Sequence, residues 1–217
     1  MNVPHPDLRA RVLAAAQATP SRTRPRGRRI AWVASAGAVA FGLLGFVWIG
    51  GLDHSVGRPR ALTFGLAAGW AAASLVLSWL VLARGGSTLA RSPRLLVAAA
   101  AVTPALCFGW MSLFAGRYDE PFARVGYRCT AYTLAMAAAP LATFLLLRRG
   151  SEPRHPSAPG AAAGAMSGAW AGVLIDLWCP LTNAPHVLVG HVLPLALLVG
   201  VGALAGSRLL GVRTLRA

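Results

Sequence analysis

The cysteines and histidines in the second half of this chain have types and spacings that could do chemistry. Cys179, His186 and His191 follow one another as C-x6-H-x4-H, and a thiolate with two imidazoles is a ligand set for a soft or borderline metal ion. This spacing matches no standard zinc pattern, and two histidines five residues apart share one face of an α-helix poorly. The residues therefore predict either a metal site at these three positions or interfacial polar groups beside a structural disulfide.

Cys129 and Cys179 form a second candidate pair. Cys129 opens one long apolar run and Cys179 closes the next, so two consecutive antiparallel helices would place both at the same end. There they would lie outside the reducing cytoplasm and within reach of a disulfide or redox role. Cys107 lies within an apolar run and is predicted to be a small core residue. Asp176, near the end of a run, is predicted to form hydrogen bonds at the membrane interface rather than to carry protons.

No enzyme signature is present in the sequence. The chain lacks HExxH, GxSxG, a P-loop and a dinucleotide-binding fingerprint. It also lacks a line of charges inside its apolar runs, which argues against ion-coupled transport. We therefore predict a protein that is not an enzyme and that has no cofactor beyond a metal ion at the Cys/His residues.

The elements that must position these residues are long apolar runs. A helix needs about 20 apolar residues to cross a bilayer, and 56% of the 217 residues are hydrophobic against 12% charged. The sequence predicts an all-α polytopic membrane bundle of six transmembrane helices over residues 30–207. The expected spans are Ile30–Ile49, Ala61–Ala83, Leu95–Ala115, Cys129–Leu147, Ala161–Ile175 with an extension to Trp178, and Val187–Ser207.

Small residues and prolines within the runs predict how the helices pack. Glycines recur every fourth residue from Gly160 to Gly172, and small stripes let membrane helices approach closely. We expect this stripe to serve packing within the chain rather than dimerisation, and the helix that carries it to lie inside the bundle. Pro104, Pro140 and Pro194 fall within runs, where neighbouring helices can satisfy the freed carbonyls, and they predict kinks.

The basic residues predict the orientation. The net charge is +15, which could indicate nucleic-acid binding, but cytoplasmic loops of membrane proteins also collect arginine. Of the 21 basic residues, all arginine, 16 fall on the side of the N-terminus. The sequence therefore predicts that both termini, including the tail 208–217, are cytoplasmic, and that the chain makes no direct contact with nucleic acid.

Residues 1–29 form the one sizeable segment outside the predicted spans. Leu8 to Ala18 contains no helix breaker, and Ser21 to Arg29 is a basic linker. An isolated helix of about three turns is marginal in water. We therefore expect this short cytoplasmic helix either to fold on a protein partner or to lie on anionic lipid.

The second half resembles the NrsF-like negative regulators of sigma factors, six-span proteins of the bacterial inner (cytoplasmic) membrane. The resemblance is carried by an ordered set of segments: Gly126–Cys129, a span with Pro140, Leu147–Arg149, the span Gly160–Gly172, Trp178–Pro180 and Gly202–Leu210. It implies an anti-sigma factor that sequesters an extracytoplasmic-function sigma factor and releases it on an envelope signal. The family cysteines match Cys129 and Cys179. The chain departs from the family where Leu181–Asn183 replaces an acidic stretch and where His186 and His191 are added.

On this resemblance, the N-terminal helix would bind the sigma factor. Leu8, Val12 and Leu13 would enter an apolar groove, and Arg9 and Arg11 would pair with acidic groups. Two other functions are compatible with the sequence. One is a small multi-pass transporter or channel-like protein, which would need a polar path; the other is a structural membrane protein with an outer Cys/His site.

Overall fold

The computed structural model describes residues 7, 10, 59–82, 92–120, 125–148 and 155–210. In this part of the chain every regular element is a helix, which confirms the all-α prediction for it. The helices are α3 (Arg60–Leu82), α4 (Pro93–Ser112), α5 (Tyr127–Arg148), α6 (Ser157–Trp178), α7 (Ala184–Val187), the π-helical turn η3 (Leu188–Val192) and α8 (Leu193–Leu209).

Five stretches of these helices are long and apolar enough to cross a membrane: Ala61–Val81, Pro93–Ser112, Tyr127–Arg148, Ser157–Trp178 and Ala184–Leu209. They correspond to the second to sixth predicted spans, and the fifth predicted span does extend to Trp178. The first predicted span, Ile30–Ile49, and the N-terminal helix with Leu8, Arg9, Arg11, Val12 and Leu13 lie outside the described residues. Six spans and a cytoplasmic helix therefore stay predictions.

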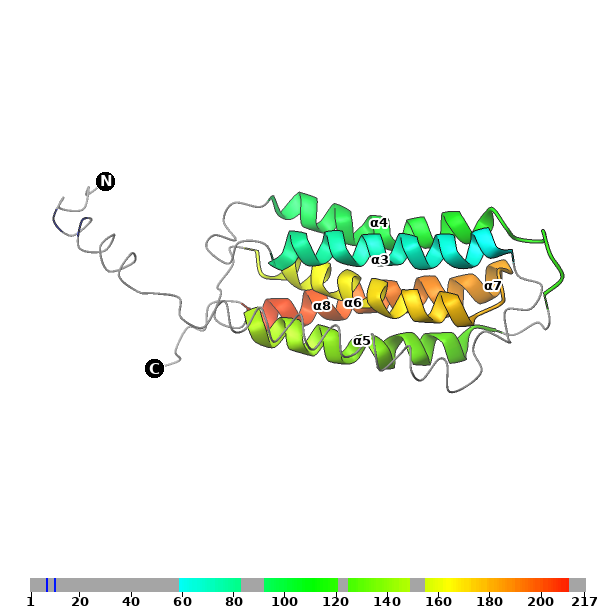
Figure 1. The fold of residues 1–217 in the computed structure, drawn as a ribbon. Coiled ribbons are helices and arrows are strands. Elements are labelled where there is room, and N and C mark those ends of the chain that lie inside the picture. Colours follow the sequence, from blue (N-terminus) through cyan, green and yellow to red (C-terminus); the bar gives the residue numbers. More distant parts are fainter. Residues whose placement is uncertain are drawn as a thin grey trace.

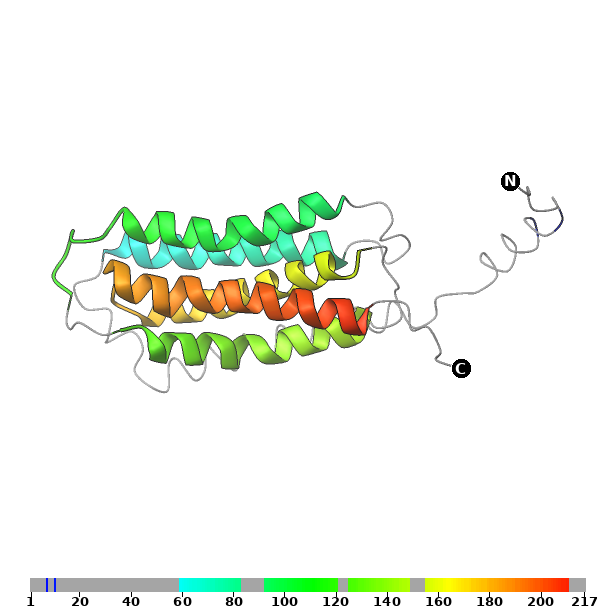
Figure 2. The same ribbon diagram turned by 180° about the vertical axis from the view of Figure 1, so that it is seen from behind.

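The five long helical stretches run side by side along one axis and alternate in direction (Figures 1 and 2). Helix α6 packs against α3, α4, α5 and α8, and 78% of its membrane-length window is buried. Large apolar side chains such as Phe64, Trp79 and Leu204 are exposed on the outer helices. A buried small-residue helix inside an apolar exterior is the arrangement expected of a bundle in lipid.

Glycines bring α6 and α8 into backbone contact. A Cβ atom on Gly160 would lie 2.1 Å from the carbonyl oxygen of Gly202, and one on Gly164 would lie 2.0 Å from that of Leu198. No side chain fits at these separations, because the atoms it would meet are backbone atoms. The stripe therefore serves packing within the chain, as predicted, and α6 lies inside the bundle.

The prolines inside the helices do not end them. Pro104 lies within α4 and Pro140 within α5, where they remove backbone donors that membrane helices tolerate losing when neighbours are close. Pro194 lies in the first turn of α8, directly after η3. Its position determines the local geometry of the site.

Candidate functional site

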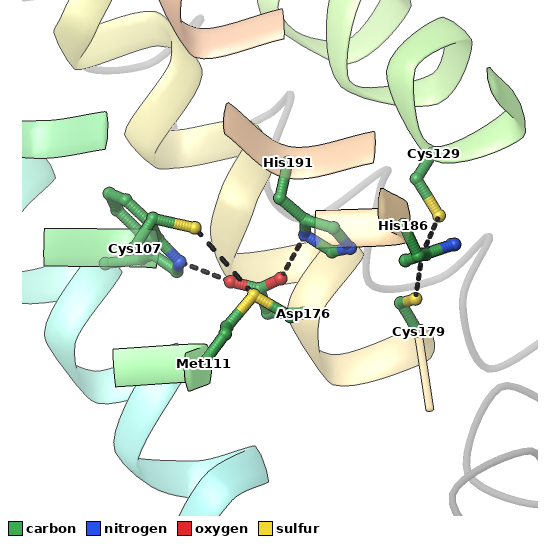
Figure 3. Close-up of polar contacts among 8 residues, drawn as sticks. Cys107, Met111, Cys129, Asp176, Cys179, His186 and His191 are labelled. Atoms are coloured by element: carbon green, nitrogen blue, oxygen red, sulfur yellow. Dashed lines mark hydrogen bonds and ion pairs between the residues drawn. The ribbon is translucent and has the colours of Figure 1, made fainter. Parts of the chain in front are cut away.

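Four buried side chains meet at the end of the bundle where the segments 113–120 and 179–183 lie. Cys129 comes from the first turn of α5, Cys179 follows α6, His186 belongs to α7 and His191 to η3 (Figure 3). Their donor atoms all lie within 4.8 Å of one another. The Nε2 atom of His186 is 3.0 Å from the Cys179 sulfur and 3.7 Å from the Cys129 sulfur. We call these four residues the Cys2His2 cluster.

The two histidines meet because the helix between them is not an α-helix throughout. The expectation that a five-residue separation keeps them apart is wrong for this chain. A π turn is wider than an α turn and closes hydrogen bonds five residues apart, and Leu188–Val192 forms such a turn. The ring centroids of His186 and His191 are consequently 5.4 Å apart.

The π turn accommodates Pro194. A proline lacks an N–H group and clashes with the carbonyl four residues before it, here that of Gly190. The wider turn lets the N–H of Leu193 donate to Leu188 instead, which leaves the carbonyl of Val189 without its usual partner. The hydroxyl of Thr130 on α5 donates to that carbonyl at 2.5 Å.

The close packing of the start of α5 against η3 also places Cys129 beside the histidines. A Cβ on Gly126 would lie 2.4 Å from both N and Cα of Gly190, so the start of α5 touches the π turn with no side chain between them. Cys129 follows one helical turn later and faces the cluster. Cys129 was predicted to have a disulfide or redox role and was not predicted as the fourth donor of the cluster.

Asp176 lies beside His191, in the last turn of α6. Its carboxylate accepts a hydrogen bond from the indole N–H of Trp70 on α3, and its Oδ1 is 2.6 Å from Nδ1 of His191. The predicted hydrogen-bonding role is confirmed. The side chain is completely buried, because α3 and η3 cover it.

Glu120 fastens the loop that carries Cys179. Its Oε1 accepts from the backbone N–H of Thr182 at 2.7 Å and from the Thr182 hydroxyl at 2.9 Å, and its Oε2 accepts from the Asn183 amide at 2.6 Å. Asn183 also caps α7 by accepting from the backbone N–H of His186 at 3.1 Å. The Tyr118 hydroxyl donates to the Pro180 carbonyl beside these contacts. Partial burial raises the pKa of Glu120, but the hydrogen bonds from Asn183 and Thr182 outweigh it and hold that pKa below its ordinary value.

Replacing Glu120 with Gln should destabilise this end of the bundle by about 1 kcal/mol at neutral pH, because one carboxylate oxygen becomes an amide that cannot accept from Asn183. A carboxylate whose pKa is lowered by folding stabilises the fold at pH values above its unfolded-state pKa. This stabilisation is lost as the pH falls through the folded-state pKa. The difference between wild type and variant should therefore shrink below pH 4.5, the ordinary value. Unfolding in detergent at pH 7 and pH 3.5 measures it, with exposed Asp119→Asn as control. A difference that persists at pH 3.5 would contradict this assignment.

Cys129 and Cys179 are free thiols in this structure, and so is Cys107. Cys107 is buried beside Met111, as the core prediction required. The disulfide between Cys129 and Cys179 stays a prediction. The cluster is a set of residues that could hold a metal ion. It contains all three predicted ligands, Cys179, His186 and His191, together with Cys129.

The comparisons with known proteins give one match. The family described as NrsF, negative regulator of sigma F, matches residues 14–211. No curated protein and no solved structure matches the chain. Because the matched region includes every described helix from α3 to α8 and most of the sequence, the chain belongs to the NrsF family of negative regulators of sigma F.

Proposed function

We propose that this protein is a membrane-embedded anti-sigma factor that holds an extracytoplasmic-function sigma factor at the bacterial inner membrane and releases it on an envelope signal. The observation that carries the proposal is the family match over residues 14–211. The family description supplies the sigma factor as partner, and the five apolar helices supply a means of membrane attachment. The chain would then act by keeping the sigma factor from core polymerase.

The proposed orientation has both termini in the cytoplasm. It is supported by the 16 of 21 basic residues assigned to that side of the spans. It also agrees with the direction of the helices, since α5 and α8 end at the same end of the bundle with Arg148 and Arg208 in their last turns (Figure 1). The Cys2His2 cluster lies at the opposite end, which would face the envelope.

The proposed sigma-binding segment is residues 1–29. Leu8, Val12 and Leu13 would bury their apolar side chains in a groove of the sigma factor, while Arg9 and Arg11 pair with acidic residues around it. A segment that folds only on its partner gives part of the interaction energy to its own ordering. A modest unfavourable change in the binding free energy can therefore release the sigma factor.

The proposed signal reaches the protein at Cys129 and Cys179. Two thiols there would lose two protons and two electrons to a disulfide-forming oxidant of the envelope and join through one S–S bond. His186 would have to leave the space beside both sulfurs. The start of α5 and the end of α6 would then repack, and this repacking would have to be passed through the bundle to the cytoplasmic end.

Copurification of the sigma factor with the full-length chain tests the proposal. We expect the wild type to retain an extracytoplasmic-function sigma factor from detergent-solubilised membranes. Changing Leu8, Val12 and Leu13 together to Ala should weaken the complex by about 2 kcal/mol or more, about 30-fold in Kd, because buried anchors dominate such interfaces. Leu204→Ala, on the exposed face of α8, is the matched control. Absence of a sigma factor from the wild-type complex would refute the proposal, and equal retention by the triple variant would refute the assigned segment.

The transporter alternative requires a polar path through the bundle. Within the described helices, the buried hydroxyls of Ser74, Thr103 and Ser167 donate to backbone carbonyls of their own helices. A hydroxyl bonded in this way has no donor left for a solute. These contacts favour a bundle whose polar chemistry is concentrated at one end.

A further inference from the structure

The donor atoms of the Cys2His2 cluster match the preference of one kind of metal ion. Two sulfur and two imidazole ligands in tetrahedral arrangement are typical of Zn2+. Bonds of about 2.3 Å to sulfur and 2.0–2.1 Å to nitrogen place a sulfur and a nitrogen ligand about 3.5 Å apart. The two sulfur–nitrogen separations at His186 are 3.0 and 3.7 Å, so small side-chain adjustments would complete such a site.

Asp176 holds the His191 ring in an orientation that suits a metal ligand. Metal-binding histidines commonly donate their second ring N–H to a carboxylate, which fixes the ring and its tautomer. Here Nδ1 of His191 lies 2.6 Å from Asp176, and Trp70 holds that carboxylate from the other side. The remaining nitrogen, Nε2, is buried and has no hydrogen-bond partner of good geometry among the described residues. It lies on the side of the ring away from Asp176 (Figure 3).

From this geometry we propose that Cys129, Cys179, His186 and His191 bind one Zn2+ ion in a closed tetrahedral site. The site is an inference beyond sigma-factor binding; because it uses the same two sulfurs, the ion would have to leave before the disulfide proposed above could form. Two thiolates cancel the charge of the divalent ion, which suits a buried position. All four ligand positions come from the protein, so the ion has no open position for catalysis and serves to hold elements together. It joins the start of α5, the end of α6, α7 and η3.

A disulfide between Cys129 and Cys179 would need a different arrangement of the same two sulfurs. It needs the sulfurs about 2.05 Å apart, whereas the structure places Nε2 of His186 beside both of them (Figure 3). A disulfide would also leave Nε2 of His191 buried without a partner, which costs about 1–3 kcal/mol. Bound zinc satisfies all four groups at once.

Metal analysis of the purified full-length chain tests the site. The protein is solubilised in detergent with a thiol reductant and dialysed, and its zinc content is measured by mass spectrometry. We expect one zinc per chain in the wild type, and at least a tenfold lower content in Cys179→Ser and His191→Ala. Cys107→Ser is the matched control, because its side chain is equally buried but lies outside the donor set, and it should retain one zinc.

A measurement on the unmutated chain protects the test against variants that fail to fold. Replacing zinc by Co2+ in the wild type should give the visible bands of tetrahedral cobalt and a thiolate-to-cobalt charge-transfer band. Alkylation of Cys129 and Cys179 should be slow until a chelator is added. A wild-type chain without zinc that gives no thiolate–cobalt band would overturn the proposal. Full zinc content in folded His191→Ala would overturn the assignment of His191.

Discussion

Replacing Asp176 with Ala is expected to lower the free energy of unfolding by about 3–5 kcal/mol, because it removes the charged acceptor of two buried donors and each hydrogen bond to a charged group contributes about 1.5–3 kcal/mol. The carboxylate is completely buried and satisfies two groups from different elements, the Trp70 indole and the His191 ring. Alanine leaves both donors without their acceptor and leaves a cavity in a tightly packed interior. Neither donor can turn to water, because α3, α6 and η3 enclose them.

Unfolding of the detergent-solubilised protein in increasing dodecyl sulfate, followed by helical circular dichroism, measures this loss. Asp119→Ala is the matched control, since Asp119 is exposed in the segment after α4, and it should change stability by less than about 0.5 kcal/mol. If both variants unfold at the same denaturant concentration, the buried Asp176 contacts do not stabilise the fold as described.

Replacing Gly126 with Ala is expected to open the Cys2His2 cluster. The new methyl group would lie 2.4 Å from N and Cα of Gly190 and 2.6 Å from the carbonyl oxygen of His186, and none of these backbone atoms can turn aside. The start of α5 must therefore move away from η3, and Cys129 moves with it. Such overpacking costs about 1–3 kcal/mol.

The reaction rate of Cys129 with a maleimide measures this opening, because a buried thiol reacts slowly and a displaced one reacts fast. We expect at least a tenfold faster reaction in Gly126→Ala. Gly109→Ala on α4 is the matched control, since nothing lies within 4 Å of the added Cβ, and its rate should equal that of wild type. An unchanged rate in Gly126→Ala would show that α5 does not need this contact.

The sequence was sufficient to predict the five long apolar helices of the described residues and the way α6 packs. Hydropathy over about 20 residues and small residues every fourth position report directly on burial in lipid and on close helix contact. The prediction that Gly160–Gly172 packs within the chain follows from that physics and agrees with the contacts to α8. It needs no information about which residues lie opposite.

The site was predicted only in part, because its geometry depends on exceptions to regular helix. Counting at 3.6 residues per turn separates His186 from His191, whereas the π turn between them, directly before Pro194, brings them together. A proline in an apolar run does not by itself indicate a bulge, because Pro104 and Pro140 lie in α-helices without one. The contacts of Trp70 with Asp176 and of Glu120 with Thr182 and Asn183 join residues at least 62 positions apart. No local pattern reports such pairs.

The π turn also sets the register of the last span. An α-helix advances about 1.5 Å and turns about 100° with each residue. If Leu188–Val192 returned to α geometry, α7 would therefore rotate and shift by one residue relative to α8. His186 would rotate away from both sulfurs, and the Val189 carbonyl would leave Thr130. Of these two registers, the one with the π turn is the register that the structure shows, and it is the one that assembles the cluster. Any group that binds all four side chains would therefore hold the last helix in the register with the π turn.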